Sequence, residues 1–259
     1  MAVPGRLDVT LRLVRNAGTA ALADLAARLG VSEMTVRRDL DELQRRGLVR
    51  RVRGGAVAVD APENGFAARA GWQAGLKERI GRATAELVAP GSTVLLDAGT
   101  TTVHVAAHLL ERAPLTVAVL SLPVAARLAD QPGIRLLVVG GESRPGEQSL
   151  AGPLAHGALR RLEFDLFVMS IGAVSARAGW SEFTLEDAAV KQVGLEQSAR
   201  TVVAADSGKL GVRAFARVAD LGAAERLVTD AGAHDPGLTP AAREALAALS
   251  DASVEVTVA

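Results

Sequence analysis

A glycine followed by three threonines is the segment of this sequence with the clearest chemistry. The segment Asp97-Ala98-Gly99-Thr100-Thr101-Thr102 follows the apolar run 93–97 and opens a stretch with helical periodicity. Gly99 lets the backbone approach a ligand closely, the first turn of a helix offers unpaired N–H groups, and the threonine hydroxyls add donors. These features favour a phosphate-binding loop. The alternative is that the threonines only cap the helix.

Lysine is rare in this chain, so the position of each lysine is informative. Of the 29 basic residues 26 are Arg, and the three Lys are Lys77, Lys191 and Lys209. Because the chain otherwise uses Arg, Lys191 and Lys209 indicate a need for a compact ammonium group. They favour an anion of phosphosugar size. Asp187 and Lys191, spaced i, i+4, also fit an ordinary surface pair on a helix.

Other small and polar residues end successive apolar runs. They are Ser121, Gly140, Gly141 and Asp206. Asp97 and Asp206 could hold sugar hydroxyls or cap turns. His104 and His108 have the i, i+4 spacing of metal ligands, but no third ligand is apparent and the chain has no Cys. We therefore predict no metal site and no cofactor.

An open α/β sheet would bring these scattered residues to one edge. From Leu76 onward, apolar β-branched runs alternate with helical segments, and the runs lie at 93–97, 115–120, 134–140, 165–172, 201–206, 225–230 and 254–258. This alternation predicts an α/β domain with a mostly parallel sheet covered on both faces. Ligands of such sheets bind beyond the carboxyl ends of the strands, where the candidate residues stand.

The first sixty residues show a different pattern. Apolar periodicity predicts helices over Arg6–Ala17, AALADLAARL and SEMTVRRDLDELQRRG, with Gly30 in the tight turn between the last two. The segment LVRRVRGGAVAV then has two short β-prone runs around Gly54-Gly55, which is typical of a hairpin. Helix, turn, helix and hairpin together predict a winged helix-turn-helix.

The charge of this N-terminal region fits a polyanionic partner. Residues 1–60 hold 11 Arg against 7 acids, whereas the rest holds 18 basic residues against 22 acids. The N-terminal end of the third helix would enter the major groove of double-stranded DNA, and the arginines after it would meet phosphates. The alternative is a small helical subdomain with a solvated basic face. The predicted DNA-binding residues are Ser32, Glu33, Thr35, Arg37, Arg38, Arg45, Arg46, Arg50, Arg51 and Arg53.

These patterns divide the chain into three parts. We predict a winged helix-turn-helix DNA-binding domain at 1–58, a linker at 59–75 and an effector-binding and oligomerisation domain at 76–259. The linker is predicted because periodicity is absent there and because Pro62, Gly65, Gly71 and Gly75 lie within it. No apolar run is long enough to span a bilayer and no signal core is visible, which predicts a cytoplasmic protein without membrane contact.

Several motifs, in order and spacing, make the chain similar to the DeoR/GlpR family of sugar-metabolism regulators. They are VSEMTVRRDLDELQRRGLVRRVRGGA, LLDAGTTT, SLPVA, VVGGESR, GPLA, AAVKQ, ADSGKLG and LVTD. The resemblance implies a sensor domain similar in fold to ribose-5-phosphate isomerase, with a phosphorylated sugar or polyol as effector. By the same resemblance the effector site consists of Asp97, Gly99, Thr100, Thr101, Thr102, Ser121, Gly140, Gly141, Lys191, Asp206 and Lys209. Leu120, Gly208 and Trp180 depart from the usual family residues.

Two functions of different classes fit these observations. The first is a transcriptional repressor of a carbohydrate-metabolism operon, acting as a dimer or tetramer, because one short recognition helix reads few base pairs. The second is a phosphosugar-converting enzyme with a DNA-binding appendage, in which carboxylates at the sheet would act as acid and base. We favour the regulator and predict that the chain is not an enzyme, because fold likeness does not carry function.

Overall fold

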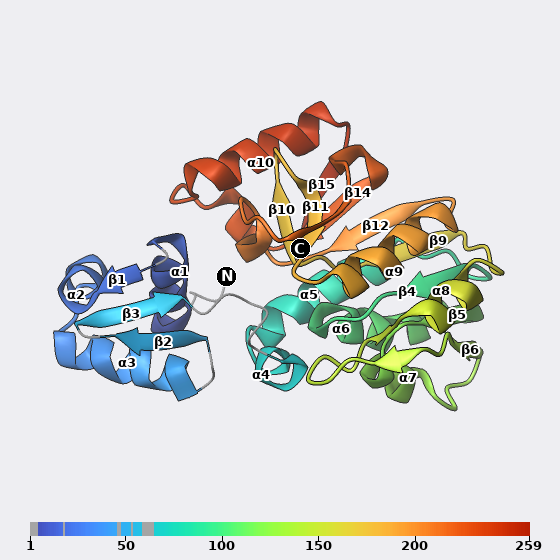
Figure 1. Ribbon diagram of the computed structural model, residues 1–259, viewed down its shortest axis with the longest axis horizontal. Helices are drawn as coiled ribbons and strands as arrows, with labels where there is room; N and C mark the ends of the chain where they lie inside the picture. Colours follow the sequence, from blue (N-terminus) through green and yellow to red (C-terminus); the bar gives the residue numbers. More distant parts are fainter. Residues whose placement is uncertain (1–4, 18, 46–47, 53, 59–64) are drawn as a thin grey trace. The chain divides into compact units, whose positions relative to one another are not determined.

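The computed structural model describes residues 5–17, 19–45, 48–52, 54–58 and 65–259 (Figure 1). The chain forms two compact units, 1–69 and 70–259. Part of the range predicted as a linker is helical, since α4 spans Phe66–Ala70 and α5 spans Ala74–Ala85. The boundary between the two units falls inside that range, and its role as a linker stays a prediction. Trp72, between the two helices, is only 8% exposed, so burial of this side chain helps to stabilise a segment whose sequence has no helical periodicity.

The smaller unit is a three-helix fold with a small antiparallel sheet. Buried apolar side chains at Leu11, Leu25 and Leu40 face one another from its three helices. The turn predicted at Gly30 is confirmed, because this glycine has φ 64° and closes the second helix. The elements are α1 (Arg6–Ala17), β1 (Thr19–Ala21), α2 (Leu22–Leu29), α3 (Glu33–Arg45), β2 (Val49–Val52) and β3 (Gly55–Ala58).

The strand β1 was not predicted. It pairs with β3, so the sheet order is β1-β3-β2 and the expected two-stranded hairpin has a third strand. A Cβ at Gly55 would lie 2.1 Å from the carbonyl oxygen of Ala20, so only glycine permits this pairing. A three-residue strand is too short to produce a periodic pattern, which explains the omission.

The larger unit contains a seven-stranded sheet in which every pairing is parallel, in the order β15-β14-β12-β9-β4-β5-β6 (Figure 1). The predicted fold class is therefore confirmed. The strands are β4 (Thr93–Leu96), β5 (Leu115–Val119), β6 (Ile134–Val138), β9 (Leu166–Met169), β12 (Thr201–Ala204), β14 (Arg226–Thr229) and β15 (Glu255–Val258).

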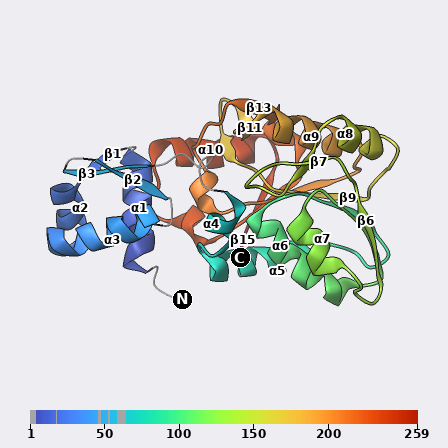
Figure 2. The same cartoon turned by 60° about the horizontal axis from the view of Figure 1, so that its bottom comes forward.

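Helices cover both faces of this sheet, and each face has its own apolar core. One core packs against α5, α6 (Thr100–Leu109) and α7 (Leu122–Leu128), and the other against α8 (Pro153–Leu159), α9 (Leu185–Glu196) and α10 (Pro240–Asp251). Figure 2 shows α8 and α9 on one side of the sheet and α5, α6 and α7 on the other. Because both faces are covered, the strands are continuous apolar runs, as the sequence predicted.

A second, antiparallel sheet was missed. It consists of β10 (Ala173–Ser175), β11 (Gly179–Glu182) and β13 (Ala216–Ala219), and a short hairpin of β7 (Glu142–Ser143) and β8 (Leu150–Ala151) follows β6. These strands mix small, polar and apolar residues (AVS, GWSE and ARVA in β10, β11 and β13), so none forms a continuous apolar run. None of the described helices is long and apolar enough to cross a membrane.

Candidate DNA interface and effector site

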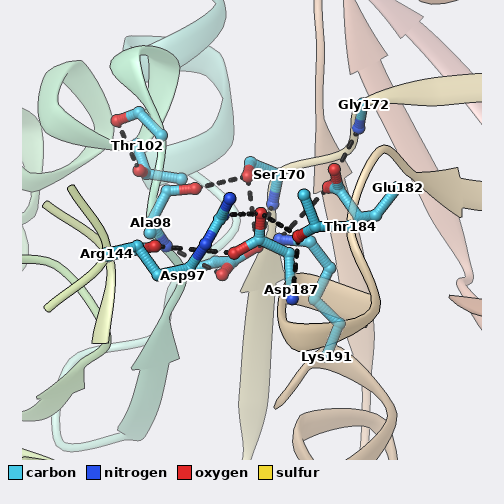
Figure 3. Close-up of polar contacts among 12 residues, drawn as sticks. Asp97, Ala98, Thr102, Arg144, Ser170, Gly172, Glu182, Thr184, Asp187 and Lys191 are labelled. Carbon is cyan, nitrogen blue, oxygen red and sulfur yellow. Dashed lines mark hydrogen bonds and ion pairs between the residues drawn. The ribbon is translucent and has the colours of Figure 1, made fainter. Parts of the chain in front are cut away.

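A buried pair of opposite charges lies at the carboxyl end of the large sheet (Figure 3). Asp97 directly follows β4 and is 1% exposed, and one of its carboxylate oxygens binds Lys191 Nζ of α9. The same oxygen accepts the Ser170 backbone N–H at 2.9 Å, and the other accepts the Ala98 N–H at 2.8 Å. The structure thus brings together two predicted effector residues, Asp97 and Lys191, but their charges are paired with each other.

A second carboxyl group, which the sequence did not reveal, completes this cluster. Glu182 of β11 lies 3.4 Å from Lys191 Nζ and accepts the Gly172 N–H at 3.0 Å. Burial raises the pKa of Glu182 more than the charge of Lys191 lowers it. Burial opposes the charge of Lys191, but the nearby Asp97 and Glu182 outweigh burial and raise its pKa. Lys191 therefore stays charged, while burial makes ionisation of Glu182 less favourable than that of a solvated glutamate.

The Gly99 and threonine segment forms the N-terminus of α6, as predicted. Thr100, Thr101 and Thr102 are buried, and the Thr102 hydroxyl donates to the Gly99 carbonyl at 2.9 Å. No side chain caps the first turn of α6, so its N–H groups are not taken by a cap. A Cβ at Gly99 would lie 3.0 Å from Ser170 Oγ, which explains the need for glycine. This geometry accommodates both alternatives, the phosphate loop and the simple helix start.

The remaining predicted effector residues stand at neighbouring strand ends. Ser121 follows β5, is 1% exposed and caps α7 by accepting the Val124 N–H. Gly140 and Gly141 follow β6 with φ 84° and 107°. Asp206 follows β12 and accepts the Gly208 N–H at 3.1 Å. Lys209 lies close enough to Glu182 for its charge to lower the pKa of that carboxyl group.

The predicted alternative of a surface pair between Asp187 and Lys191 is wrong. Lys191 is buried against Asp97, and the carboxylate of Asp187 instead binds Arg144 of the β7–β8 hairpin (Figure 3). Arg144 was visible in the sequence as the last residue of VVGGESR, but its type alone did not single it out in an Arg-rich chain. Glu182 had no sequence signal, because the strand that it ends, GWSE, is not an apolar run.

Trp180 and Leu120, which depart from the family pattern, are core residues. Both are completely buried, and Trp180 Nε1 donates to the Leu221 carbonyl at 2.9 Å. Trp180 is therefore part of the apolar core. Gly208 is exposed in a single turn at Ser207–Lys209.

A hollow on the opposite edge of the sheet does not suit an anion. Its lining includes Glu163, Asp165 and Glu196 and no basic residue. The pKa of Asp165 is lowered by hydrogen bonds from Thr93, so this carboxyl group stays charged. Electrostatic repulsion would exclude a phosphate there. The charged cluster beyond β4 and β9 is the better candidate.

The two histidines of α6 share one acidic partner. Nδ1 of His104 lies 2.8 Å from Glu78, and Nε2 of His108 lies 2.6 Å from the other oxygen of that carboxylate. These hydrogen bonds lower the pKa of Glu78. The described part of the chain contains no group of three side chains placed to hold a metal ion.

On the smaller unit, α3 presents a polar face. Val36, Leu40 and Leu43 are completely buried, whereas the predicted DNA-binding residues Ser32, Glu33, Arg37 and Arg38 are exposed and Thr35 is half-buried. Ser32 Oγ accepts the Thr35 N–H at 3.2 Å and so begins the helix. Arg37 and Arg38 leave the first turns of α3 toward solvent, where phosphates and base edges would lie.

Several arginines of this unit already have acidic partners. Arg6 binds the buried Asp39 through two nitrogens at 2.7 and 2.9 Å. Arg45 pairs with Glu42, and Arg51 pairs with Asp41. Two of the predicted DNA-binding residues, Arg45 at the end of α3 and Arg51 of β2, are therefore paired with carboxylates of α3. Arg46, Arg53 and the side chain of Arg50 lie outside the described residues.

Comparison with known proteins connects both units to one family. The family described as "DeoR C terminal sensor domain" matches residues 72–231, and "DeoR-like helix-turn-helix domain" matches residues 6–61. "Transcriptional repressor AccR" of Agrobacterium fabrum is 34% identical over 86% of this chain and 87% of that protein. The "Glycerol-3-phosphate regulon repressor" of Escherichia coli is 29% identical over 85% of this chain and 88% of that protein.

Among solved structures, ribose 5-phosphate isomerase A of Methanocaldococcus jannaschii is similar to part of the chain. It is 15% identical and covers 50% of this chain and 51% of that chain, at a TM-score of 0.36. A likeness of this size supports no conclusion about function.

A helix-turn-helix unit joined to an α/β sensor unit defines a transcriptional regulator rather than an enzyme. The chain belongs to the DeoR family of such regulators. The resemblance expected from the motifs is therefore confirmed.

Proposed function

We propose that this chain represses a carbohydrate-metabolism operon and that a phosphorylated sugar or polyol changes its affinity for operator DNA. The observation that carries the proposal is the presence, in one chain, of an exposed polar face on α3 and a charged cluster at the carboxyl end of a parallel sheet. The repressor role is supported by relatives named as repressors, one of them of a glycerol-3-phosphate regulon. The proposed place of action is the cytoplasm.

The DNA part of the proposal assigns direct contacts to the N-terminal half of α3. Arg37 and Arg38 are exposed there, and a guanidinium that reads a guanine contributes about 1–3 kcal/mol to discrimination. Ser32, Glu33 and Thr35 are assigned to phosphates or base edges, with the Glu33 carboxylate suited to a base-edge donor. The arginines at the end of α3 and around β2 are assigned to phosphates. A homo-oligomer, dimer or tetramer, supplies the second recognition helix that useful specificity requires.

The effector part of the proposal assigns the ligand to the edge beyond β4, β5, β6 and β12. The N–H groups at the start of α6 and the cations of that edge suit a phosphate, and the polar groups around Ser121 and Asp206 suit sugar hydroxyls. For coupling, the ligand must bind more tightly to one arrangement of the DNA-binding units than to another.

A mobility-shift assay with the purified full chain tests the DNA part. The protein should enrich a specific duplex from a random pool, and Arg37→Ala and Arg38→Ala should each bind that duplex about tenfold more weakly. Arg243→Ala, which removes an exposed arginine from α10, is the matched control and should bind like the parent. Parental binding by both α3 variants would show that α3 is not the recognition helix.

A thermal-shift screen tests the effector part. Phosphorylated sugars, polyols and sugar acids should include a compound that raises the melting temperature, whereas its unphosphorylated form should not. That compound should then change the affinity for the selected duplex. A stabilising ligand without effect on DNA binding would contradict the coupling. Sedimentation of the free protein as a monomer would contradict the homo-oligomer.

A further inference from the structure

The β7–β8 hairpin is held over the carboxyl end of β5 by its backbone. The Leu150 N–H donates to the Leu120 carbonyl at 2.8 Å, and the Leu122 N–H donates to the Gln148 carbonyl at 3.0 Å. Within the hairpin the Arg144 N–H donates to the Ser149 carbonyl at 2.9 Å. The base of the Arg144 side chain is therefore fixed, while its guanidinium extends from the hairpin toward α9 (Figure 3).

The guanidinium of Arg144 meets a carboxylate at the start of α9. Nη1 binds the Asp187 carboxylate, which also accepts a hydrogen bond from the Thr184 hydroxyl at 3.1 Å. Asp187 lies in the first turn of this twelve-residue helix, whose positive end favours a negative charge. The side chains of Arg144 and Asp187 are 22% and 21% exposed, so water reaches both partners.

This pair differs from the neighbouring pair in its access to solvent. The side chains of Lys191 and Asp97 are 4% and 1% exposed, so a ligand could not take Lys191 from Asp97 without leaving a buried carboxylate uncompensated. When Asp187 releases Arg144, its carboxylate can be hydrated instead. A guanidinium also offers two parallel N–H donors, which match a phosphate better than an ammonium does.

We propose that Arg144 recognises the anionic group of the effector and that Asp187 occupies Arg144 in the ligand-free chain. The inference rests on the proposed function in placing an anionic effector at this edge. The effector's phosphate replaces the Asp187 carboxylate on the guanidinium, and that carboxylate becomes hydrated while the Thr184 hydroxyl still donates to it. Arg144 is then the ligand-contacting cation, and the buried Lys191 is a positioning residue that fixes Asp97.

Internal competition predicts effects of opposite sign for the two partners. Removal of the Asp187 charge frees Arg144, so Asp187→Asn should bind an anion more tightly. A partly exposed ion pair reduces the binding-competent fraction only moderately, so we expect a gain of about fivefold. Arg144→Gln removes the charged donors and should weaken binding at least about tenfold. A static salt bridge that only ties the hairpin to α9 predicts no gain in either variant.

Titration of the full-length chain with inorganic phosphate, against chloride at equal ionic strength, tests the inference. The half-saturation concentration is read from the shift of the melting temperature, which is also recorded without phosphate to confirm folding. Arg144→Lys should bind with intermediate affinity, because it keeps the charge but loses the fork. Glu225→Gln is the matched control, because it neutralises the partner of Arg200 at the amino ends of β12 and β14.

Each outcome is decisive. Tighter binding by Asp187→Asn, weaker binding by Arg144→Gln and parental binding by Glu225→Gln support the inference. If the parent binds phosphate but Asp187→Asn is folded and binds no more tightly, the internal competition is overturned while the proposed function stands. If neither the parent nor any variant binds phosphate, both the role of Arg144 and the phosphorylated effector are overturned, and DNA binding remains a separate question.

Discussion

Replacement of Lys191 by methionine is expected to destabilise the larger unit strongly. Methionine retains most of the side-chain volume, but it leaves the Asp97 carboxylate, 1% exposed, without a positive charge. The N–H groups of Ala98 and Ser170 still bind this carboxylate, yet hydrogen bonds do not cancel its charge. Breaking one partner of a buried pair costs about 3–5 kcal/mol. For a unit of this size the melting temperature should fall by about 6–20 °C.

Tryptophan fluorescence is the appropriate assay, because both tryptophans, Trp72 and Trp180, lie in the unit 70–259. The signal therefore follows the larger unit without interference from the smaller one. The double variant Asp97→Asn/Lys191→Met should recover at least half of the loss, since no uncompensated charge remains.

Arg217→Met provides a matched control for the loss of a cation. Its partner Asp220 is 87% exposed, so the variant should change stability by less than about 1 kcal/mol. Melting of Lys191→Met within about 2 °C of the parent, a shift that a fraction of 1 kcal/mol produces, would refute the reasoning. Failure of the double variant to recover would equally show that electrostatic imbalance is not the cause.

The remaining two predictions concern Glu182 and Arg6. Burial raises the pKa of Glu182, so the folded state binds a proton that the unfolded state has lost, and the free energy of unfolding should fall as pH rises above the ordinary range of a glutamate. Glu182→Gln should remove this dependence of the free energy of unfolding on pH. Denaturant unfolding between pH 4 and 8, at intervals of about one pH unit, measures it. An unchanged slope would mean that Glu182 is ionised throughout. Arg6→Ala leaves the buried Asp39 without its cation, so it should accelerate hydrogen exchange of the α3 amides in the full chain. Protection equal to that of the parent would show that Arg6 contributes nothing to the fold.

The periodic patterns predicted the elements that carry an apolar signal and missed those that do not. The helices around Gly30 and the continuous apolar runs of the parallel sheet reveal themselves by the spacing of their side chains. By contrast, β1, β10 and β11 read TAA, AVS and GWSE, which form no apolar run, and their pairing depends on tertiary contacts such as the close approach at Gly55. The helix α4 inside the predicted linker was likewise not predicted, because that segment has no apolar periodicity, although Trp72 beside it is buried.

The candidate site was predicted in position but not in its interactions. Strand ends indicate which residues share an edge, so Asp97 and Ser121 were expected near one another. Lys191, on a helix, was singled out by the scarcity of lysine and by the family resemblance. Sequence does not tell how deeply a charge is buried, and burial decides that Lys191 serves Asp97. The scarcity of lysine was a correct indication of special use, but it could not distinguish a ligand contact from an internal pair.

The two ion pairs at this edge, Lys191 with Asp97 and Arg144 with Asp187, have the same charges but differ in their exposure to solvent. In the buried pair of Asp97 and Lys191, separation would require either charge to remain in a poorly solvated interior, so the pair acts as a fixed support for the loop after β4. In the pair of Arg144 and Asp187, each partner is about one-fifth exposed, so water offsets much of the cost of exchange. A regulator that binds its effector by exchange of an ion pair needs an exchangeable pair such as Arg144 and Asp187 and also a fixed pair such as Lys191 and Asp97 that holds the surrounding loops in place. Depth of burial, more than residue type, therefore separates the positioning cation from the recognising cation in this chain.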